Sequence, residues 1–127
     1  MTNNGIVTRT SRGSADDTLA RLERVLADRH VKVFAVIDHS GEAARAGLQM
    51  PPTKLLIVGN PAAGTPLMLS APSTAIDLPM KILVAEDGAG QTTVSNNSAA
   101  YLEERHGFDH ALARNLAAIE DIIAEAM

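Results

Sequence analysis

The sequence predicts an α+β protein, a two-layer sandwich in which a largely antiparallel sheet of about five strands is backed by two main helices. Short stretches rich in β-branched residues alternate with stretches whose apolar residues recur every three or four positions. A glycine-containing turn over residues 87–90 joins two strand-like stretches, as in an antiparallel hairpin. The length of 127 residues suits one hydrophobic core, so residues 1–127 are expected to form a single domain.

The N-terminal part predicts a strand, a main helix and a second strand. Residues 6–11 alternate apolar and polar side chains, as a half-buried strand does. Gly13 and Ser14 then supply a turn and a helix N-cap. Residues 31–37 are rich in β-branched residues and predict the second strand. The core face of the main helix carries apolar side chains at helical spacing: Leu19, Leu22, Val25 and Leu26.

The middle of the chain predicts two short helices on either side of a central strand. The first helix is expected over residues 42–48, where the two prolines that follow stop it. Residues 54–58 are apolar on both faces, as in a central strand. Asn60-Pro61 and Thr65-Pro66 each place a capping side chain before proline, so two helix starts compete. The second helix is expected over residues 67–71, beginning near Thr65.

The C-terminal part predicts the hairpin and two further helices. The two strands of the hairpin are expected over residues 80–86 and 91–96. A short helix over residues 99–106 is expected to end at Gly107. The second main helix follows and carries its apolar face at Leu112, Leu116, Ile119 and Ile123.

Charge and aromatic content disfavour nucleic acid as a partner. The chain has 15 acidic and 11 basic residues, a formal net charge of -4, and no cluster of Lys and Arg. Binding to a phosphate backbone needs concentrated positive charge, and binding to single strands relies on aromatic side chains on which bases stack. Only Phe34, Tyr101 and Phe108 are aromatic.

The absence of cysteine excludes disulfides, thiolate zinc sites and cysteine nucleophiles. The start of the chain has no basic stretch followed by an apolar run of signal-peptide length, and no apolar segment is long enough to span a bilayer. We therefore expect a cytoplasmic protein with no membrane partner.

The histidines do not predict a metal site. His106 and His110 are four residues apart, the spacing that places two ligands on one helical face. Gly107 lies between them and is better explained as a helix terminator. No metal and no cofactor are expected.

The segment 59–66 is a candidate binding loop. Its glycines resemble the spacing of a phosphate-binding loop, but the required lysine is missing because Thr65 directly follows Gly64. Backbone N–H groups at a helix start can still receive an anion, with Asn60, Gly64 and Thr65 as candidate binding residues. The simpler interpretation, which the sequence favours, is a capped chain reversal without a ligand.

Six further polar residues are candidates for binding, each with a simpler structural explanation. A side chain at a strand end can face a cleft or merely solvent, a carboxylate beside a hairpin can shape the turn, and a tyrosine can bury its ring while its hydroxyl finds a partner. No serine lies in a nucleophile-elbow pattern, so a Ser-His-Asp hydrolase has no support. The six are His39, Asp77, Lys81, Glu86, Tyr101 and His106.

Several short motifs occur in a distinctive order along nearly the whole chain. The most specific are Gly59-Asn60-Pro61 and Gly64-Thr65-Pro66-Leu67-Met68, since generic turn chemistry would not require both. The others are Asp38-His39, Pro52-Thr53, Asp77-Leu78-Pro79 with Lys81, Glu86-Asp87, and Tyr101-Leu102 with Arg105-His106-Gly107. Together they resemble the domain-of-unknown-function family 302. The resemblance implies a compact α+β fold and a homodimer, but no reaction, cofactor or catalytic residue set.

Three functions therefore stay open. The first is a module that binds a small molecule or an anion at the loop 59–66. The second is an enzyme that uses His39 or His106 in proton transfer, with Asp77, Lys81 or Glu86 orienting the substrate. The third is a homodimeric interaction protein without catalysis. Convergence of the polar candidates on one pocket separates the second from the others.

Overall fold

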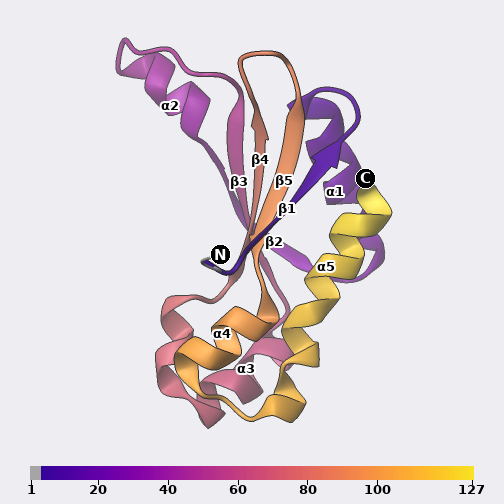
Figure 1. Cartoon of the computed structure of the whole chain (residues 1–127), viewed down its shortest axis with the longest axis vertical. Coiled ribbons are helices and arrows are strands. Elements are labelled where there is room, and N and C mark those ends of the chain that lie inside the picture. The colour runs from indigo at the N-terminus through magenta and orange to yellow at the C-terminus, as the bar shows by residue number, and fades with distance from the viewer. Residues whose placement is uncertain (1–3) are drawn as a thin grey trace.

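The computed structural model describes residues 4–127 and shows a five-stranded sheet with helices along one side and at both ends (Figure 1). In chain order the elements are β1 (Ile6–Ser11), α1 (Ala15–Asp28), β2 (Lys32–Asp38), α2 (His39–Arg45), β3 (Thr53–Gly59), α3 (Pro61–Ser70), the 3-10 helix η1 (Pro72–Ile76), β4 (Met80–Glu86), β5 (Thr92–Asn97), α4 (Ala99–His106), the 3-10 helix η2 (His110–Leu112) and α5 (Arg114–Ala126).

The strand order is β1-β5-β4-β3-β2, and every neighbouring pair is antiparallel. The β4–β5 pair is the predicted hairpin, closed by residues 87–91. The helices α1 and α5 lie together on one side of the sheet, on the right in Figure 1. The predicted α+β sandwich is therefore confirmed.

The core lies between the sheet and these two helices. Alternate residues of β3, β4 and β5 point toward the helices and are buried, as is most of the apolar face of α1 and of α5. Each fully buried Leu, Ile or Val side chain contributes roughly 1.5–3 kcal/mol. The central members of the core are Leu22, Leu26, Leu56, Val58, Ile82, Val84, Val94, Ile122 and Ile123.

Helix α3 differs from its prediction because the first of the two competing starts prevails. It begins at Pro61, and Asn60 caps it by accepting a hydrogen bond from the Ala62 amide at 2.9 Å. Proline is favoured at the first helical position because its missing N–H is not needed there. Thr65 and Pro66 lie inside the helix, so the predicted beginning near Thr65 is wrong.

Helix α2 also begins earlier than predicted, at His39, because Asp38 caps it through a hydrogen bond from the Gly41 amide at 2.9 Å. Helix α4 matches its prediction, and Gly107 ends it in the left-handed conformation. The predicted N-cap Ser14 is confirmed, since its side chain accepts from the Asp17 amide at 3.0 Å. Among residues 4–127, no helix has the length and apolarity to cross a membrane.

Candidate functional site

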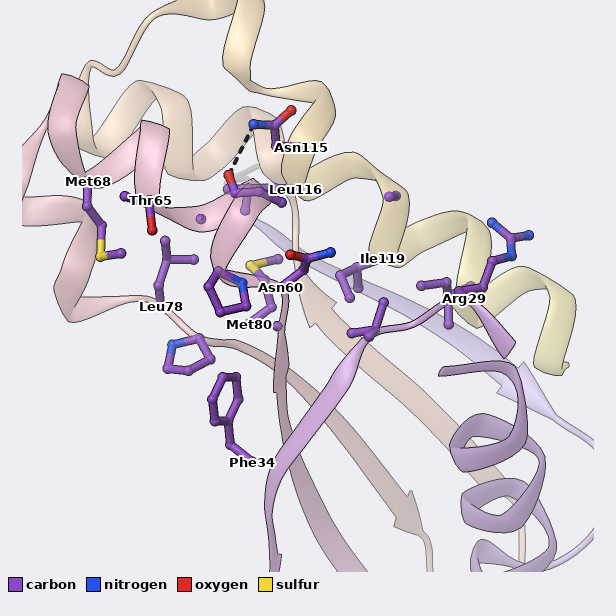
Figure 2. A pocket seen from close by; sticks show the side chains of 18 residues that line it. Arg29, Phe34, Asn60, Thr65, Met68, Leu78, Met80, Asn115, Leu116 and Ile119 are labelled. Carbon is purple, nitrogen blue, oxygen red and sulfur yellow. Dashed lines mark hydrogen bonds between the residues drawn. The ribbon is translucent and has the colours of Figure 1, made fainter. Parts of the chain in front are cut away.

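A cavity of about 400 Å³ opens where α3 and α5 meet the ends of β2, β3 and β4 (Figure 2). Its wall is mostly apolar. The side chains that line it come from segments far apart in the sequence and include Phe34, Met68, Leu78, Met80, Leu116, Ile119 and Ile122.

Four polar side chains interrupt this apolar wall, and one of them, Arg29, is paired with Glu125 at 2.9 Å. Asn115 donates from Nδ2 to the Ala63 carbonyl at 3.0 Å and so ties α5 to α3. Asn60 uses its Oδ1 to cap α3, which leaves its Nδ2 without a partner among residues 4–127. The Thr65 hydroxyl likewise has no partner within the described chain. Two hydrogen-bond donors are therefore available to a molecule in the cavity.

The backbone amides at the start of α3 are already occupied. Pro61 has no N–H, and the Ala62 amide donates to Asn60 Oδ1. The amides of Ala63 and Gly64 both donate to the Asn60 carbonyl at 2.9 Å. The candidate anion site in the loop 59–66 depended on free N–H groups, and these three amides do not provide them.

A second group of candidates lies outside the cavity, where η1 meets the end of α4. His106 Nε2 is 2.5 Å from Asp77 Oδ2, and Arg105 Nη1 is 3.2 Å from the same oxygen. The other ring nitrogen of His106, Nδ1, lies 2.8 Å from the Ser73 hydroxyl. The histidine side chain is 4% exposed and the aspartate side chain 17%.

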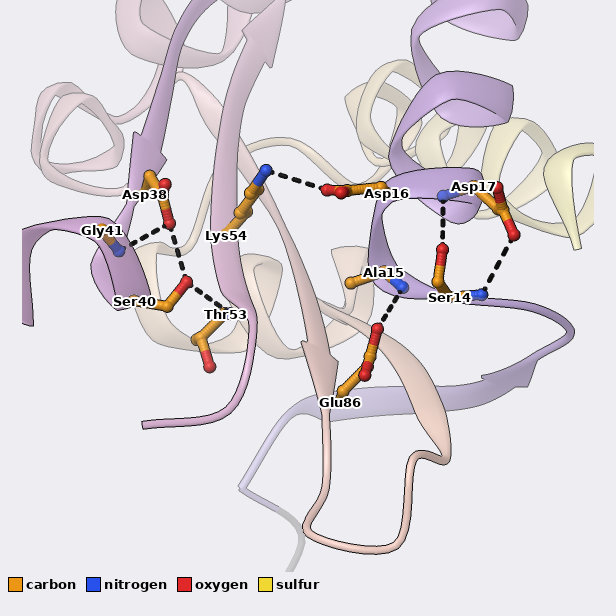
Figure 3. A network of polar contacts seen from close by, with 10 residues as sticks. All are labelled: Ser14, Ala15, Asp16, Asp17, Asp38, Ser40, Gly41, Thr53, Lys54 and Glu86. Atoms are coloured by element: carbon orange, nitrogen blue, oxygen red, sulfur yellow. Dashed lines mark hydrogen bonds and ion pairs between the residues drawn. The ribbon is translucent and has the colours of Figure 1, made fainter. Parts of the chain in front are cut away.

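The remaining candidates are dispersed. Glu86 accepts from the Ala15 amide at 2.7 Å and supports the start of α1 (Figure 3). Lys81 donates to the Pro79 carbonyl at 3.3 Å, and the alternation of β4 points it away from α1 and α5. Tyr101 packs its ring against Gly5, and His39 is the first residue of α2.

The structure thus brings Asn60, Gly64 and Thr65 to one cavity and places Asp77 against His106 elsewhere. These residues do not share one pocket with Lys81 and Glu86. Ser73 and Asn115 were not among the site residues predicted from the sequence. Asn115 could have been found from its position beside the apolar face of the last helix, whereas nothing in the sequence singles out Ser73. No group of three or more His, Asp or Glu within residues 4–127 could hold a metal ion.

Asp38 forms a hydrogen-bonded chain that links α2 to β3 (Figure 3). Its Oδ1 accepts from the Gly41 amide and from the Ser40 hydroxyl, at 2.9 and 2.7 Å, and Ser40 Oγ accepts from the Thr53 amide at 3.1 Å. The amide of Gly41, and then the hydroxyl of Ser40, hold the pKa of Asp38 below its ordinary value of 3.8. The ionised carboxylate therefore stabilises the start of α2.

Acidification is expected to unwind α2 locally. Because the pKa of Asp38 is lower in the folded state, its contribution is present above the unfolded value of 3.8 and is lost as pH falls through the lower folded value. Carbon chemical shifts of residues 39–45 followed from neutral pH to about pH 2 measure this. In Asp38→Asn the same shifts should be less helical at neutral pH and should lack the acid transition. An identical transition in both proteins would show that another group controls α2.

The fold and the cavity define a two-layer α+β protein with an apolar cavity at one end of its sheet. The crystal structure of an uncharacterized conserved DUF302 protein from Bacillus stearothermophilus has the same fold. The TM-score is 0.81 at 22% sequence identity, covering 98% of this chain and 96% of that one.

Longer relatives also match. The proteins named fluoride-specific ion channel FluC 1 of Brucella suis biovar 1 and of Brucella abortus biovar 1 are each 40% identical to this chain over 102 residues. The match covers 80% of this chain but only 40% and 38% of those proteins. The family described as Domain of unknown function DUF302 matches residues 7–126. The chain belongs to this family.

Proposed function

We propose that this chain is a binding module for a small, largely apolar molecule that carries a hydrogen-bond acceptor. The cavity of about 400 Å³ carries the proposal, since apolar walls with a few polar groups are typical of small-molecule sites. The acceptor would lie against Asn60 Nδ2 and the Thr65 hydroxyl, while Met68, Leu78 and Ile119 would contact the apolar part.

The relatives named as fluoride channels suggest a second ligand, fluoride itself. As a small, strongly hydrated acceptor, fluoride could reach the same two donors. The apolar walls make it the less favourable ligand, because moving a charge out of water is costly unless it is fully paired. We therefore rank it second and include it in the test.

Ligand titration followed by NMR tests the proposal, using a panel of small apolar carboxylic acids, amides and alcohols, with sodium fluoride as a separate arm. We expect shifts at residues 60–68 and 115–122. Thr65→Val removes one donor and keeps the shape, so affinity should fall about fivefold or more, the loss of roughly one hydrogen bond. Gly64→Leu should fill the cavity and abolish binding.

The matched control is Thr93→Val, which makes the same change on β5, far from the cavity lining. It should leave affinity unchanged. Shifts confined to other parts of the chain, or equal affinity in Thr65→Val and wild type, would remove the cavity as the binding site.

We also propose that two copies of the chain pair through the side of the sheet that α1 and α5 leave open. On the face opposite the core, β3 and β4 carry Leu55, Ile57 and Leu83, with Leu55 and Leu83 as direct partners across the strands. Lys81 lies at the edge of this apolar group as the partner of Ile57. The solvent face of a two-layer sheet is ordinarily polar, so this apolar centre favours a covering partner. The family resemblance favours a second copy as that partner.

Light scattering tests the pairing. Wild type should show about twice the chain mass of 13.4 kDa at micromolar concentration, and Leu83→Glu should show a single chain with an unchanged circular dichroism spectrum. The control Leu69→Glu alters a leucine that is 80% exposed on α3 and should remain paired. A single-chain mass for wild type would refute the homodimer.

A further inference from the structure

Ser73, His106 and Asp77 form a continuous hydrogen-bonded array on the part of the molecule that η1 and α4 share. The Ser73 hydroxyl lies 2.8 Å from His106 Nδ1, and His106 Nε2 lies 2.5 Å from Asp77 Oδ2. A nucleophile bonded to a base, with the base held by a carboxylate, is the arrangement that activates serine in hydrolases of unrelated fold. Neither a sequence motif nor the proposed binding function accounts for it.

We propose that Ser73 is an activated nucleophile that cleaves small carboxylic esters, with His106 as its general base. In this array Asp77 accepts from Nε2–H, which leaves Nδ1 unprotonated and able to accept the Ser73 proton. Asp77 therefore fixes the tautomer in which the base faces the nucleophile.

The burial of the three side chains suits these roles. The side chain of His106 is 4% exposed and that of Asp77 17%, so little solvent reaches their hydrogen bond. Arg105 contacts the same Asp77 oxygen at 3.2 Å and holds the carboxylate in place. Ser73 itself is exposed, so an incoming ester can reach its hydroxyl.

The reaction would proceed in two steps. Ser73 Oγ bonds to the ester carbonyl carbon, the carbon–oxygen bond to the leaving alcohol breaks, and the Ser73 proton passes through His106 Nδ1 to that alcohol. Water then attacks the acyl-serine, gives a proton to His106, and releases the carboxylic acid as the proton returns to Ser73. The Ser73 amide has no acceptor among residues 4–127 and could donate to the oxyanion of each step.

The position of the array favours small esters as substrates. None of the three residues lines the cavity, and Ser73 lies at the surface. Because the apolar cavity does not extend to this site, the proposal takes esters of short acyl groups, such as acetyl esters, as the substrates. This activity is independent of ligand binding in the cavity, and either can fail while the other holds.

Covalent labelling with a fluorophosphonate probe tests the nucleophile in the intact chain. Mass spectrometry should find one adduct, on the peptide that contains Ser73, and Ser73→Ala should abolish it. Asp77→Asn keeps the shape but loses the carboxylate, so the labelling rate should fall at least tenfold. The same variants should lose hydrolysis of p-nitrophenyl acetate in parallel.

The matched control is Ser70→Ala, since Ser70 lies three residues away and accepts from the Asp109 amide rather than from a histidine. It should label and hydrolyse like wild type. Absence of a Ser73 adduct, or labelling of Asp77→Asn at the wild-type rate, would overturn the proposal and leave the array as a clamp between η1 and α4. Circular dichroism of each variant separates loss of activity from loss of fold.

Discussion

Replacing Gly5 by alanine is expected to destabilise the protein by about 2–5 kcal/mol, the sum of a backbone and a packing cost. Gly5 has φ +80°, a left-handed conformation that costs an alanine about 1–2 kcal/mol. A Cβ there would also come within 2.2 Å of Tyr101 Cγ, so the ring and the strand β1 beside it would have to shift. Overpacking of this kind typically costs about 1–3 kcal/mol.

Thermal unfolding measures the effect, with an expected fall in Tm of roughly 10 °C or more. Gly64→Ala is the control, because its Cβ would meet Leu78 Cδ1 at 3.6 Å, an ordinary contact, and Gly64 lies inside helix α3. That variant should be as stable as wild type or up to about 1 kcal/mol more stable. Equal Tm values for the two variants would contradict the argument.

The double variant Gly5→Ala with Tyr101→Ala separates the two costs. Removing the ring of Tyr101 should relieve the packing cost of the alanine but not its backbone cost. The double variant should therefore be destabilised by at least about 1 kcal/mol less than the sum of the two single destabilisations. Simple additivity would show that the ring does not oppose a side chain at this position.

The elements that the sequence predicted best are those defined by local chemistry. The N-cap Ser14, the strand over residues 80–86 and the helix ending at Gly107 each depend on side chains within a few positions of one another. Helix α3 was predicted less well because Asn60 and Thr65 offer equivalent caps before proline. Only the structure shows that Asn60 is the cap of α3, because its side chain accepts the hydrogen bond from the Ala62 amide.

The candidate sites depend on contacts that local patterns cannot show. Asn60, Gly64 and Thr65 were predicted as one group because they are neighbours in sequence, but the apolar walls opposite them come from β2, β4 and α5. The helix η1, which presents Ser73 to His106, was not predicted at all. This 3-10 helix has no periodic apolar face from which it could be predicted. His106, the partner of the Ser73 hydroxyl, lies 33 residues further along the chain, so local sequence patterns could not connect the two.

Replacing Arg21 by alanine is expected to cost about 2–3 kcal/mol, because its guanidinium joins three elements through charge-assisted hydrogen bonds. From α1, its Nε donates to the Ala126 carbonyl at the end of α5, at 2.7 Å. Its Nη2 donates to the Ser11 hydroxyl at the end of β1 and to the Arg12 carbonyl, at 3.0 and 2.8 Å. The last carbonyls of a helix lack partners within it, so this positive group also suits the end of α5.

Arg21→Lys separates charge from geometry. The single ammonium of lysine keeps the positive charge but cannot reproduce the planar guanidinium that reaches α5 and β1 together. The free energy of unfolding should therefore fall in Arg21→Lys by more than half of its fall in Arg21→Ala. Arg29→Ala is the control, since Arg29 forms an ion pair with Glu125 in which the side chains are 45% and 50% exposed, and such pairs contribute about 0–1 kcal/mol. Chemical denaturation of the three variants gives the free energies of unfolding. If the free energy of unfolding of Arg21→Lys equalled that of wild type, charge alone would account for the effect. If Arg29→Ala lost as much stability as Arg21→Ala, the hydrogen bonds that join α1, α5 and β1 would have no special role.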